Sequence, residues 1–218
     1  MSIDGADLAA RLANSLEGGQ ERALWLPLMR LLAAGKPVDV SDLAHATGRP
    51  IDAVSNSLAA FPDTEYDDEN RIVGQGLTLR PTRHQFTVDG QQLYTWCALD
   101  TLIFPALLSK DATIQSTSPT SGETVHLRIE AGAATHVEPP TAVVSLVNPE
   151  DLSAIRSAFC NQVHYFTSPE DAQPWLDSHP GGEVRPVQDA YQLATAMATT
   201  MLEQANRKGP TLRHGSCC

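Results

Sequence analysis

Three short segments with helical periodicity and a turn-rich stretch occupy the first part of the chain. Glu21–Ala34 places leucines at helical spacing, which predicts an amphipathic helix. A second helix is expected over Val40–Ala46 with Gly48 as its C-cap, and a third begins at Pro50. Glu65–Thr82 then alternates strand-like runs with turns. Three helices and a hairpin predict a winged helix-turn-helix outline.

The second part of the chain starts with alternating rather than helical patterns. His84–Val88 and Gln91–Tyr94 are expected to be strands joined by a turn at Asp89–Gly90. A helix is predicted from near Trp96 into Phe104, ahead of Pro105. The remaining expected elements are strands over Thr113–Thr117, Thr124–Glu130 and Thr141–Leu146, a turn leading into a strand over Ala158–Phe166, and helices over Pro169–Ser178 and Val187–Arg207.

Together these patterns predict an α+β fold. We expect a three-helix winged helix-turn-helix-like subdomain over residues 21–82, preceded by an extension over residues 1–20. A larger domain over residues 83–207 should contain a mixed, mostly antiparallel sheet with flanking helices. Residues 208–218 are expected to be a flexible tail that ends in a pair of cysteines.

The charge balance argues against nucleic acid as a partner. The 218 residues carry a formal net charge of -11, and a phosphate backbone repels such a protein. The third predicted helix, PIDAVSNSLAAF, contains no Lys or Arg, although a recognition helix needs cations for phosphates and guanine edges. The winged outline is therefore expected to be structural or to cover a substrate, with DNA binding as the disfavoured alternative.

The amino-terminal sequence and the hydrophobic runs indicate a soluble, cytoplasmic protein without a membrane partner. The first residues lack a basic segment followed by an apolar core. No run approaches the roughly 18 apolar residues of a membrane span. Because cytoplasmic thiols stay reduced, the four cysteines are expected to serve chemistry or packing rather than disulfides.

The segment LYTWCALDTLIFPALL contains the first candidate site. Cys97 and Asp100 are three residues apart, so on a helix they share a face. A carboxylate among apolar neighbours is costly unless it has a partner or holds a proton, and a raised pKa suits proton transfer at neutral pH. Spacing alone also allows a plainer interpretation, in which Asp100 caps local backbone and Cys97 is a small core residue.

The second candidate is Cys160, in the segment RSAFCNQVHYF. A buried structural cysteine is the default interpretation, and a nucleophilic dyad with His164 requires strand alternation to place both side chains on one face. The seven histidines are scattered without metal-ligand spacing. Neither a glycine-rich phosphate loop nor a GxSxG elbow is present in the sequence.

Taken together, LYTWCALDTLIFPALL and FCNQVHYF closely resemble the two signature segments of the alkylmercury (organomercurial) lyases. The stretch Thr64–Thr82 and the run EPPTAVVSLV at Glu138–Val147 are also similar to that family, in the same order. The resemblance to this family covers most of the chain, from about Glu21 to Leu202. Relatives often carry a further cysteine where this chain has Gln115–Ser118, and we expect activity to survive its absence.

The resemblance implies that residues 83–207 form a catalytic domain that cleaves carbon–mercury bonds. Family cysteines correspond to Cys97 and Cys160, which would bind mercury, and the family's proton-shuttling acid corresponds to Asp100. Soft thiolates are the side chains that select soft metals, and the leaving carbon needs a proton. No organic cofactor or resident metal is implied; external thiols assist turnover, and Hg(II) is a product.

Expectations about the pocket and the partners follow from this resemblance. Trp96, Phe104 and Phe159 should shape an apolar pocket for the organic group of an organomercurial substrate. Cys217 and Cys218 form a possible relay that hands Hg(II) to a mercuric reductase, against the alternative of an unimportant tail. The competing function is a mercury sensor or regulator that uses the winged subdomain on DNA.

Overall fold

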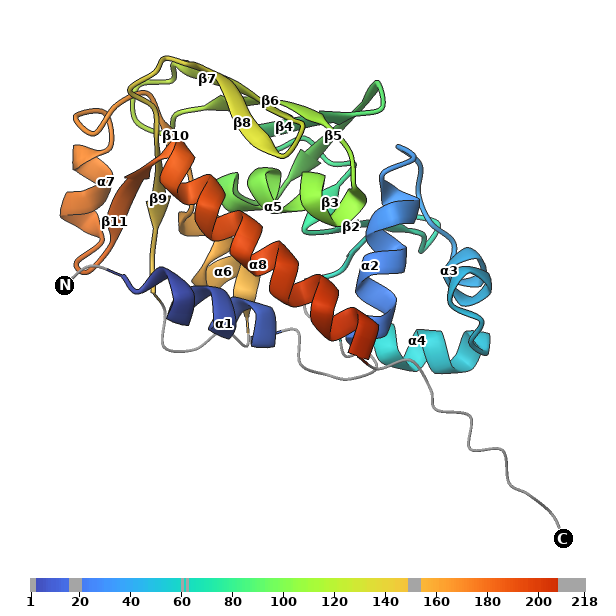
Figure 1. Ribbon diagram of the computed structural model, residues 1–218. Helices are drawn as coiled ribbons and strands as arrows, with labels where there is room; N and C mark the ends of the chain where they lie inside the picture. Colours follow the sequence, from blue (N-terminus) through green and yellow to red (C-terminus); the bar gives the residue numbers. More distant parts are fainter. Residues whose placement is uncertain (1–2, 16–20, 60, 62, 149–153, 208–218) are drawn as a thin grey trace, which may run out of the picture.

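The computed structural model describes residues 3–15, 21–59, 61, 63–148 and 154–207 (Figure 1). The amino-terminal part contains the predicted three helices and hairpin, preceded by one further helix. The elements are α1 (Gly5–Ser15), α2 (Glu21–Leu32), α3 (Val40–Thr47), α4 (Ile51–Ala59), β1 (Glu65–Tyr66), β2 (Ile72–Gln75) and β3 (Leu77–Thr78). Gly48 ends α3 in the left-handed conformation with φ 64°, as a C-cap glycine should.

A single antiparallel sheet connects this amino-terminal part to the rest of the molecule. Its eight strands follow the order β1-β2-β3-β5-β4-β6-β7-β8. The wing strand β3 pairs with β5, with Leu77 opposite Thr95, so the wing and the core share one hydrogen-bonded layer. The core strands are β4 (His84–Val88), β5 (Gln91–Thr95), β6 (Ala112–Thr117), β7 (Thr124–Glu130) and β8 (Ala133–Glu138).

A second, smaller sheet, in the order β10-β9-β11, lies at the end of the molecule opposite to helices α2, α3 and α4 (Figure 1). Helices lie between its strands and after the last of them. These elements are β9 (Val143–Leu146), α6 (Ile155–Ala158), the 3-10 turn η1 (Cys160–Gln162), β10 (Tyr165–Phe166), α7 (Gln173–Ser178), β11 (Glu183–Pro186) and α8 (Val187–Arg207).

Helix α5 (Ala98–Leu108) lies at the centre of the core. Most of its side chains are buried, which agrees with a helix that is apolar on all sides. It packs under the large sheet, and α8 crosses it on the other side with α1 alongside (Figure 1). The start of α5 is therefore enclosed by elements from both ends of the chain.

The structure differs from the sequence-based expectation in several elements. Helix α5 continues through Pro105 to Leu108 instead of ending at Phe104, because Leu107 is 1% exposed and its burial outweighs one missing backbone hydrogen bond. Strands β8 and β11 were not predicted. Residues 1–20 were set aside as an extension, yet α1 contributes buried side chains such as Leu8 and Leu12 to the core.

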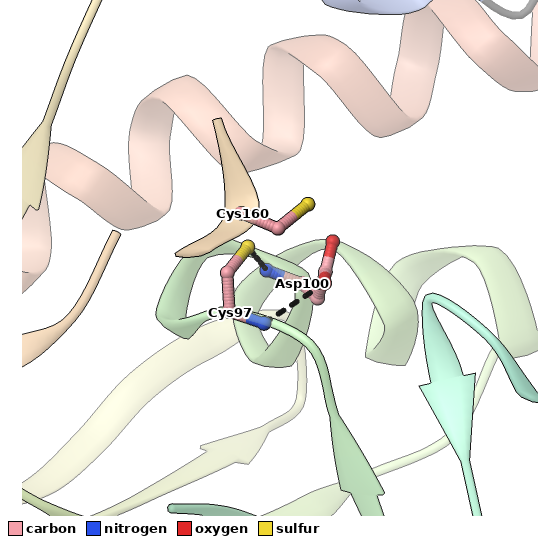
Figure 2. Close-up of side chains that lie close together, drawn as sticks. All are labelled: Cys97, Asp100 and Cys160. Atoms are coloured by element: carbon pink, nitrogen blue, oxygen red, sulfur yellow. Dashed lines mark hydrogen bonds between the residues drawn. The ribbon is translucent and has the colours of Figure 1, made fainter. Parts of the chain in front are cut away.

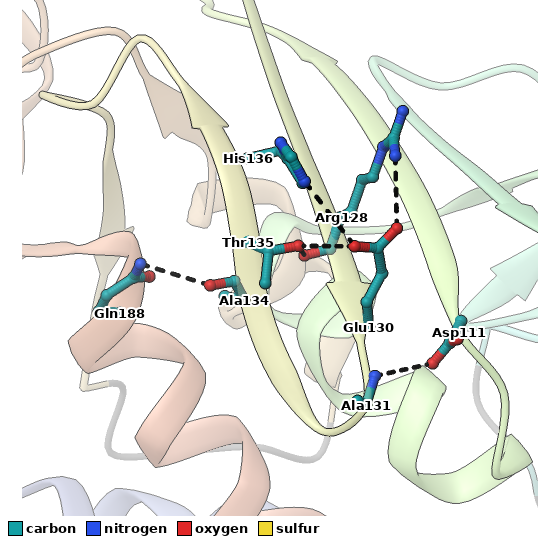
Figure 3. A network of polar contacts seen from close by, with 8 residues as sticks. All are labelled: Asp111, Arg128, Glu130, Ala131, Ala134, Thr135, His136 and Gln188. Atoms are coloured by element: carbon teal, nitrogen blue, oxygen red, sulfur yellow. Dashed lines mark hydrogen bonds and ion pairs between the residues drawn. The ribbon is translucent and has the colours of Figure 1, made fainter.

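The exposed edge of the large sheet is the β7–β8 hairpin, which polar contacts tie down (Figure 3). Glu130 accepts from Thr135 at 3.2 Å and pairs with Arg128 at 3.4 Å. The Ala131 amide at the turn donates to Asp111 at 3.1 Å, and Gln188 of α8 donates to the Ala134 carbonyl at 3.4 Å. The edge strand itself, β8, ends in the charged Glu138, and a charged side chain on an edge strand discourages pairing with another sheet.

The fold class is the α+β class that the sequence predicts, with a winged amino-terminal part and a mostly antiparallel core. Within the described residues, no helix is both long enough and apolar enough to cross a membrane.

Candidate active site

Cys97 and Asp100 begin helix α5 and are joined by two reciprocal hydrogen bonds. Cys97 is the N-cap, and its sulfur accepts from the Asp100 amide at 3.4 Å. The Asp100 carboxylate in turn accepts from the Cys97 amide at 3.1 Å. This is a capping box with a thiol where Ser or Thr is usual. The capping role considered for Asp100 is thus present, and it also orients both side chains towards one point.

Cys160 reaches the same point from a distant part of the sequence (Figure 2). It lies in η1, and the turn is held against α5 by the Ala98 amide, which donates to the Val163 carbonyl at 3.1 Å. The Thr101 hydroxyl bonds the Tyr165 hydroxyl at 2.8 Å and fixes the next strand to the same helix. As a result the two Cys sulfurs and an Asp100 oxygen all lie within 4.8 Å of one another.

Burial sets the protonation of this cluster. It raises the pKa of Asp100 to about 7, although hydrogen bonds from Cys97 lower it. Burial also raises the pKa of Cys97 well above its usual value, with Cys160 and Asp100 adding to the rise. For Cys160 the hydrogen bond with Cys97 lowers the pKa, but burial and Asp100 raise it overall. The resting site is therefore rich in protons, with the carboxyl group titrating near neutrality.

A largely apolar cavity of about 60 Å³ opens onto Asp100 and Cys160. All three residues predicted to shape it, Trp96, Phe104 and Phe159, do line it. The sequence did not predict the remaining wall, which comes from five helices and the β2–β3 turn: Leu12, Trp25, Gln75, Gly76, Leu99, Ile103, Ile155, Met197 and Met201. For Met197 and Met201 the sequence does contain an indication: they are four residues apart on the predicted last helix and therefore share one of its faces.

A buried polar network lies beside the cavity and was also missed. The carboxylate of Glu65 on β1 pairs with Arg156 of α6 at 2.6 Å and accepts from the Trp96 indole at 3.3 Å. The Arg156 guanidinium lies 4.6 Å from the centre of the Trp96 ring, a cation–π contact. These residues are separated by 31 or more positions in sequence, so no local pattern could have joined them.

The dyad of Cys160 with His164 is not found in the structure. Cys160 lies in a 3-10 turn, so the strand alternation required for a dyad with His164 does not apply. The His164 ring instead stacks on His84, with centroids 5.9 Å apart. Cys217 and Cys218 lie outside the described residues.

Comparison with known proteins gives the family. The model of the alkylmercury lyase family matches residues 77–199, and the model named helix-turn-helix domain of alkylmercury lyase matches residues 5–76. The chain belongs to the alkylmercury lyase family. An alkylmercury lyase of Bacillus cereus is 48% identical over 222 residues, which cover 100% of this chain and 99% of the relative. One of Streptomyces lividans is 50% identical, over 93% and 96% of the two chains.

The alkylmercury lyase family is also recognised in three dimensions. The crystal structure of the mercury-bound form of MerB2 superposes with a TM-score of 0.73 at 26% identity, covering 92% of this chain and 100% of that one. The family match begins at residue 5, so it includes α1, which the quoted sequence motifs left out. The chain is accordingly an enzyme of the alkylmercury lyase kind, with the function of an organomercurial lyase.

Proposed function

We propose that this enzyme cleaves the carbon–mercury bond by protonolysis, with Cys97 and Cys160 as mercury ligands and Asp100 as the group that moves the proton. One observation carries the proposal: two sulfurs and a carboxylate oxygen lie within 4.8 Å of one another, and Cys160 and Asp100 of this cluster line an apolar cavity. Thiolates are preferred ligands of soft metals, and the carboxyl group has a pKa near neutrality.

The first step is exchange of thiolates on mercury. The substrate arrives as R–Hg–SR′, where SR′ is an external thiolate. One cysteine sulfur forms a bond to mercury, the bond to SR′ breaks, and the cysteine proton leaves with SR′ as R′SH. The mercury then lies within reach of the second sulfur, because the two sulfurs are neighbours before substrate binds.

The second step transfers a proton to carbon. The remaining thiol gives its proton to the Asp100 carboxylate as its sulfur bonds to mercury, and added electron density weakens the bond from mercury to carbon. Asp100 then delivers that proton to the carbon. The electron pair of the carbon–mercury bond becomes the new carbon–hydrogen bond, R–H leaves, and Hg(II) stays on two thiolates.

The balance of the reaction is R–Hg–SR′ plus two cysteine thiols giving R–H, R′SH and Hg(II) bound by two cysteine thiolates. Two further external thiols restore both cysteine protons and remove mercury as Hg(SR′)₂. The proposal therefore requires external thiols and no organic cofactor or resident metal, because mercury enters as substrate and leaves as product.

The cavity supports a role for its apolar wall in binding the organic group. The cavity's volume of about 60 Å³ exceeds the roughly 15 Å³ that a single water molecule needs, which leaves room for a small alkyl group. Trp96, Phe104 and Phe159 would exclude water around the reacting carbon and favour apolar substituents.

The competing proposal is a mercury sensor that acts on DNA, and it has less support. Helix α4 carries Asp52 in its first turn and no basic residue, and the whole chain has a net charge of -11. We propose that the winged subdomain binds no nucleic acid and serves the enzyme itself.

A direct test mixes the purified protein with methylmercury and excess thiol and measures methane. We expect catalytic methane release by the native protein. Cys97→Ser, Cys160→Ser and Asp100→Asn should each lower kcat by roughly 100-fold or more, the size of a lost acid–base or nucleophilic group. Asp177→Asn, an exposed carboxylate on α7, is the matched control. Stoichiometric mercury binding without methane would favour the sensor.

The carboxyl-terminal cysteine pair suggests a second, separable proposal. Cys217 and Cys218 could pass Hg(II) from the site to a mercuric reductase by thiol exchange. Changing both to Ser should slow transfer to the reductase and leave methane formation unchanged. Equal transfer rates with and without the pair would refute the relay.

A further inference from the structure

Glu65 is a buried carboxylate of the winged subdomain that lies next to the mercury site. It is 7% exposed and sits on β1, in the part of the chain matched by the helix-turn-helix model. Its oxygens accept hydrogen bonds from the Thr78 hydroxyl and the Trp96 indole and pair with Arg156. Burying a carboxylate is costly, so three donors from three different segments indicate a site built for this charge.

The partners of Glu65 are attached to both thiol-bearing segments. Trp96 immediately precedes Cys97, and Arg156 lies four residues before Cys160. The indole and the guanidinium also contact each other face on, at 4.6 Å. One carboxylate on a third segment thus holds the two chain segments whose relative position determines the gap between the sulfurs.

The space for this carboxylate is shaped by a glycine on the neighbouring strand. A Cβ atom at Gly74 of β2 would lie 2.2 Å from a Glu65 oxygen and 2.7 Å from the Thr78 hydroxyl. No side chain fits there while Glu65 keeps its place. The space left by Gly74 is a second observation, separate from the Glu65–Arg156 ion pair. An ion pair on the protein surface would need no glycine beside it.

We propose that Glu65 is a positioning residue for the mercury site: through Arg156 and Trp96 it fixes the spacing of Cys97 and Cys160. This gives the winged subdomain a task within the enzyme. The inference rests on the proposed function, in which both sulfurs must bind the same mercury atom.

Displacing Glu65 should affect the steps that need both sulfurs more than the first encounter with substrate. Attachment of mercury to a single thiol requires no defined gap, whereas bond cleavage does. We therefore expect kcat to fall while KM changes little, and Hg(II) held in the site to be lost more easily to competing thiols.

The test compares Glu65→Gln, which removes the charge, with Gly74→Ala, which displaces the carboxylate and leaves it charged. Asp67→Asn on the same hairpin is the control, because it removes the Asp67–Arg71 ion pair and touches nothing in the site. All variants carry Cys217→Ser and Cys218→Ser, so that only the site thiols bind mercury. Circular dichroism and thermal melting identify the folded variants.

In the folded variants we expect kcat for methylmercury to fall by roughly 10- to 100-fold with Glu65→Gln or Gly74→Ala. KM should stay within about twofold, and external thiol should remove Hg(II) faster. If Glu65 acts through Arg156, then the double variant Glu65→Gln with Arg156→Leu should have a kcat no lower than that of the slower of the two single variants. Native kcat and Hg(II) retention in either folded variant, or fully additive losses in the double variant, would overturn the proposal. If the unchanged protein does not hold Hg(II) through both thiols, the proposed function itself fails.

Discussion

Asp100 combines a structural task with a chemical one on a single side chain. Its carboxylate accepts the Cys97 amide at 3.1 Å and so completes the cap of α5. The same carboxylate lies beside two thiols, and desolvation raises its pKa to about 7. An ionised carboxylate would be stabilised by the helix amino terminus, so desolvation outweighs that effect here.

This raised pKa predicts a pH-dependent difference in stability between the native protein and Asp100→Asn. A group whose pKa is higher in the folded state than the usual 3.8 favours folding fully below that value, and the contribution is lost as the pH rises through about 7. The Asn variant keeps an acceptor for the cap and never ionises. Its unfolding free energy relative to the native protein should therefore increase by up to a few kcal/mol between pH 4 and 8. Urea unfolding at several pH values measures this, and a pH-independent difference would contradict it.

His84 and His164 make the unfolding free energy change with pH in the opposite direction. Burial, together with nearby Arg83, lowers the pKa of His164 from 6.5 to about 4, and the pKa of His84 is also well below 6.5. Their contribution to stability is present above pH 6.5 and is lost as the pH falls towards 4. His164→Leu should flatten this acid loss of unfolding free energy, whereas the exposed His45→Leu should not. Equal pH slopes in both variants would count against the prediction.

At the scale of elements, the start of α5 separates the capping role of Cys97 from its role at mercury. Cys97→Ser retains an N-cap oxygen and loses the thiol, whereas Cys97→Ala loses both. We expect the Ser variant to melt near the native temperature and the Ala variant to lose about 1 kcal/mol of stability. Both should be inactive towards methylmercury. An Ala variant as stable as the Ser variant would show that the sulfur does not cap the helix.

Sequence patterns predicted the elements that local contacts determine. The hairpin β4–β5 has its turn at Asp89 and Gly90, and α3 ends at Gly48, because turn and cap residues act on their immediate neighbours. Strands β8 and β11 were missed, since they depend on pairing with β7 and β9 across the sheets.

Contacts between distant segments also limit how much of the site the sequence can predict. The signature segments identified Cys97, Asp100 and Cys160 as candidates, and the structure brings them together. No periodicity could reveal the Glu65–Arg156 pair or the wall formed by Leu12, because those contacts join segments far apart in the chain.

At the scale of the whole molecule, both ends of the described chain close over the cavity. Leu12 of α1 and Met201 of α8 line it. Helix α1 is fastened by the side chains of β11: Glu183 accepts the Ile3 amide at 2.8 Å, and Arg185 donates to the Ile3 carbonyl at 2.5 Å. The amino-terminal helix therefore limits the room for the organic group.

Shortening Leu12 should widen the substrate range. Leu12→Ala removes apolar atoms from the wall of the cavity, so an aryl group should fit with less displacement of neighbouring side chains. We expect kcat/KM for phenylmercury to rise several-fold relative to that for methylmercury. Ala9→Gly, a buried α1 position outside the cavity wall, is the control for a general loosening of the helix. An unchanged ratio of the two substrates would contradict this role of Leu12.

X-ray absorption spectroscopy of one equivalent of Hg(II) added directly to the protein, so that no turnover is needed, addresses the convergence of the two thiols on a single mercury atom. The protein should carry Cys217→Ser and Cys218→Ser, and external thiol should be removed beforehand. We predict two sulfur ligands on mercury in this protein and one sulfur ligand when either Cys97→Ser or Cys160→Ser is added. Two sulfur ligands that persist after Cys97 or Cys160 is replaced, or a single sulfur ligand before replacement, would contradict the mechanism.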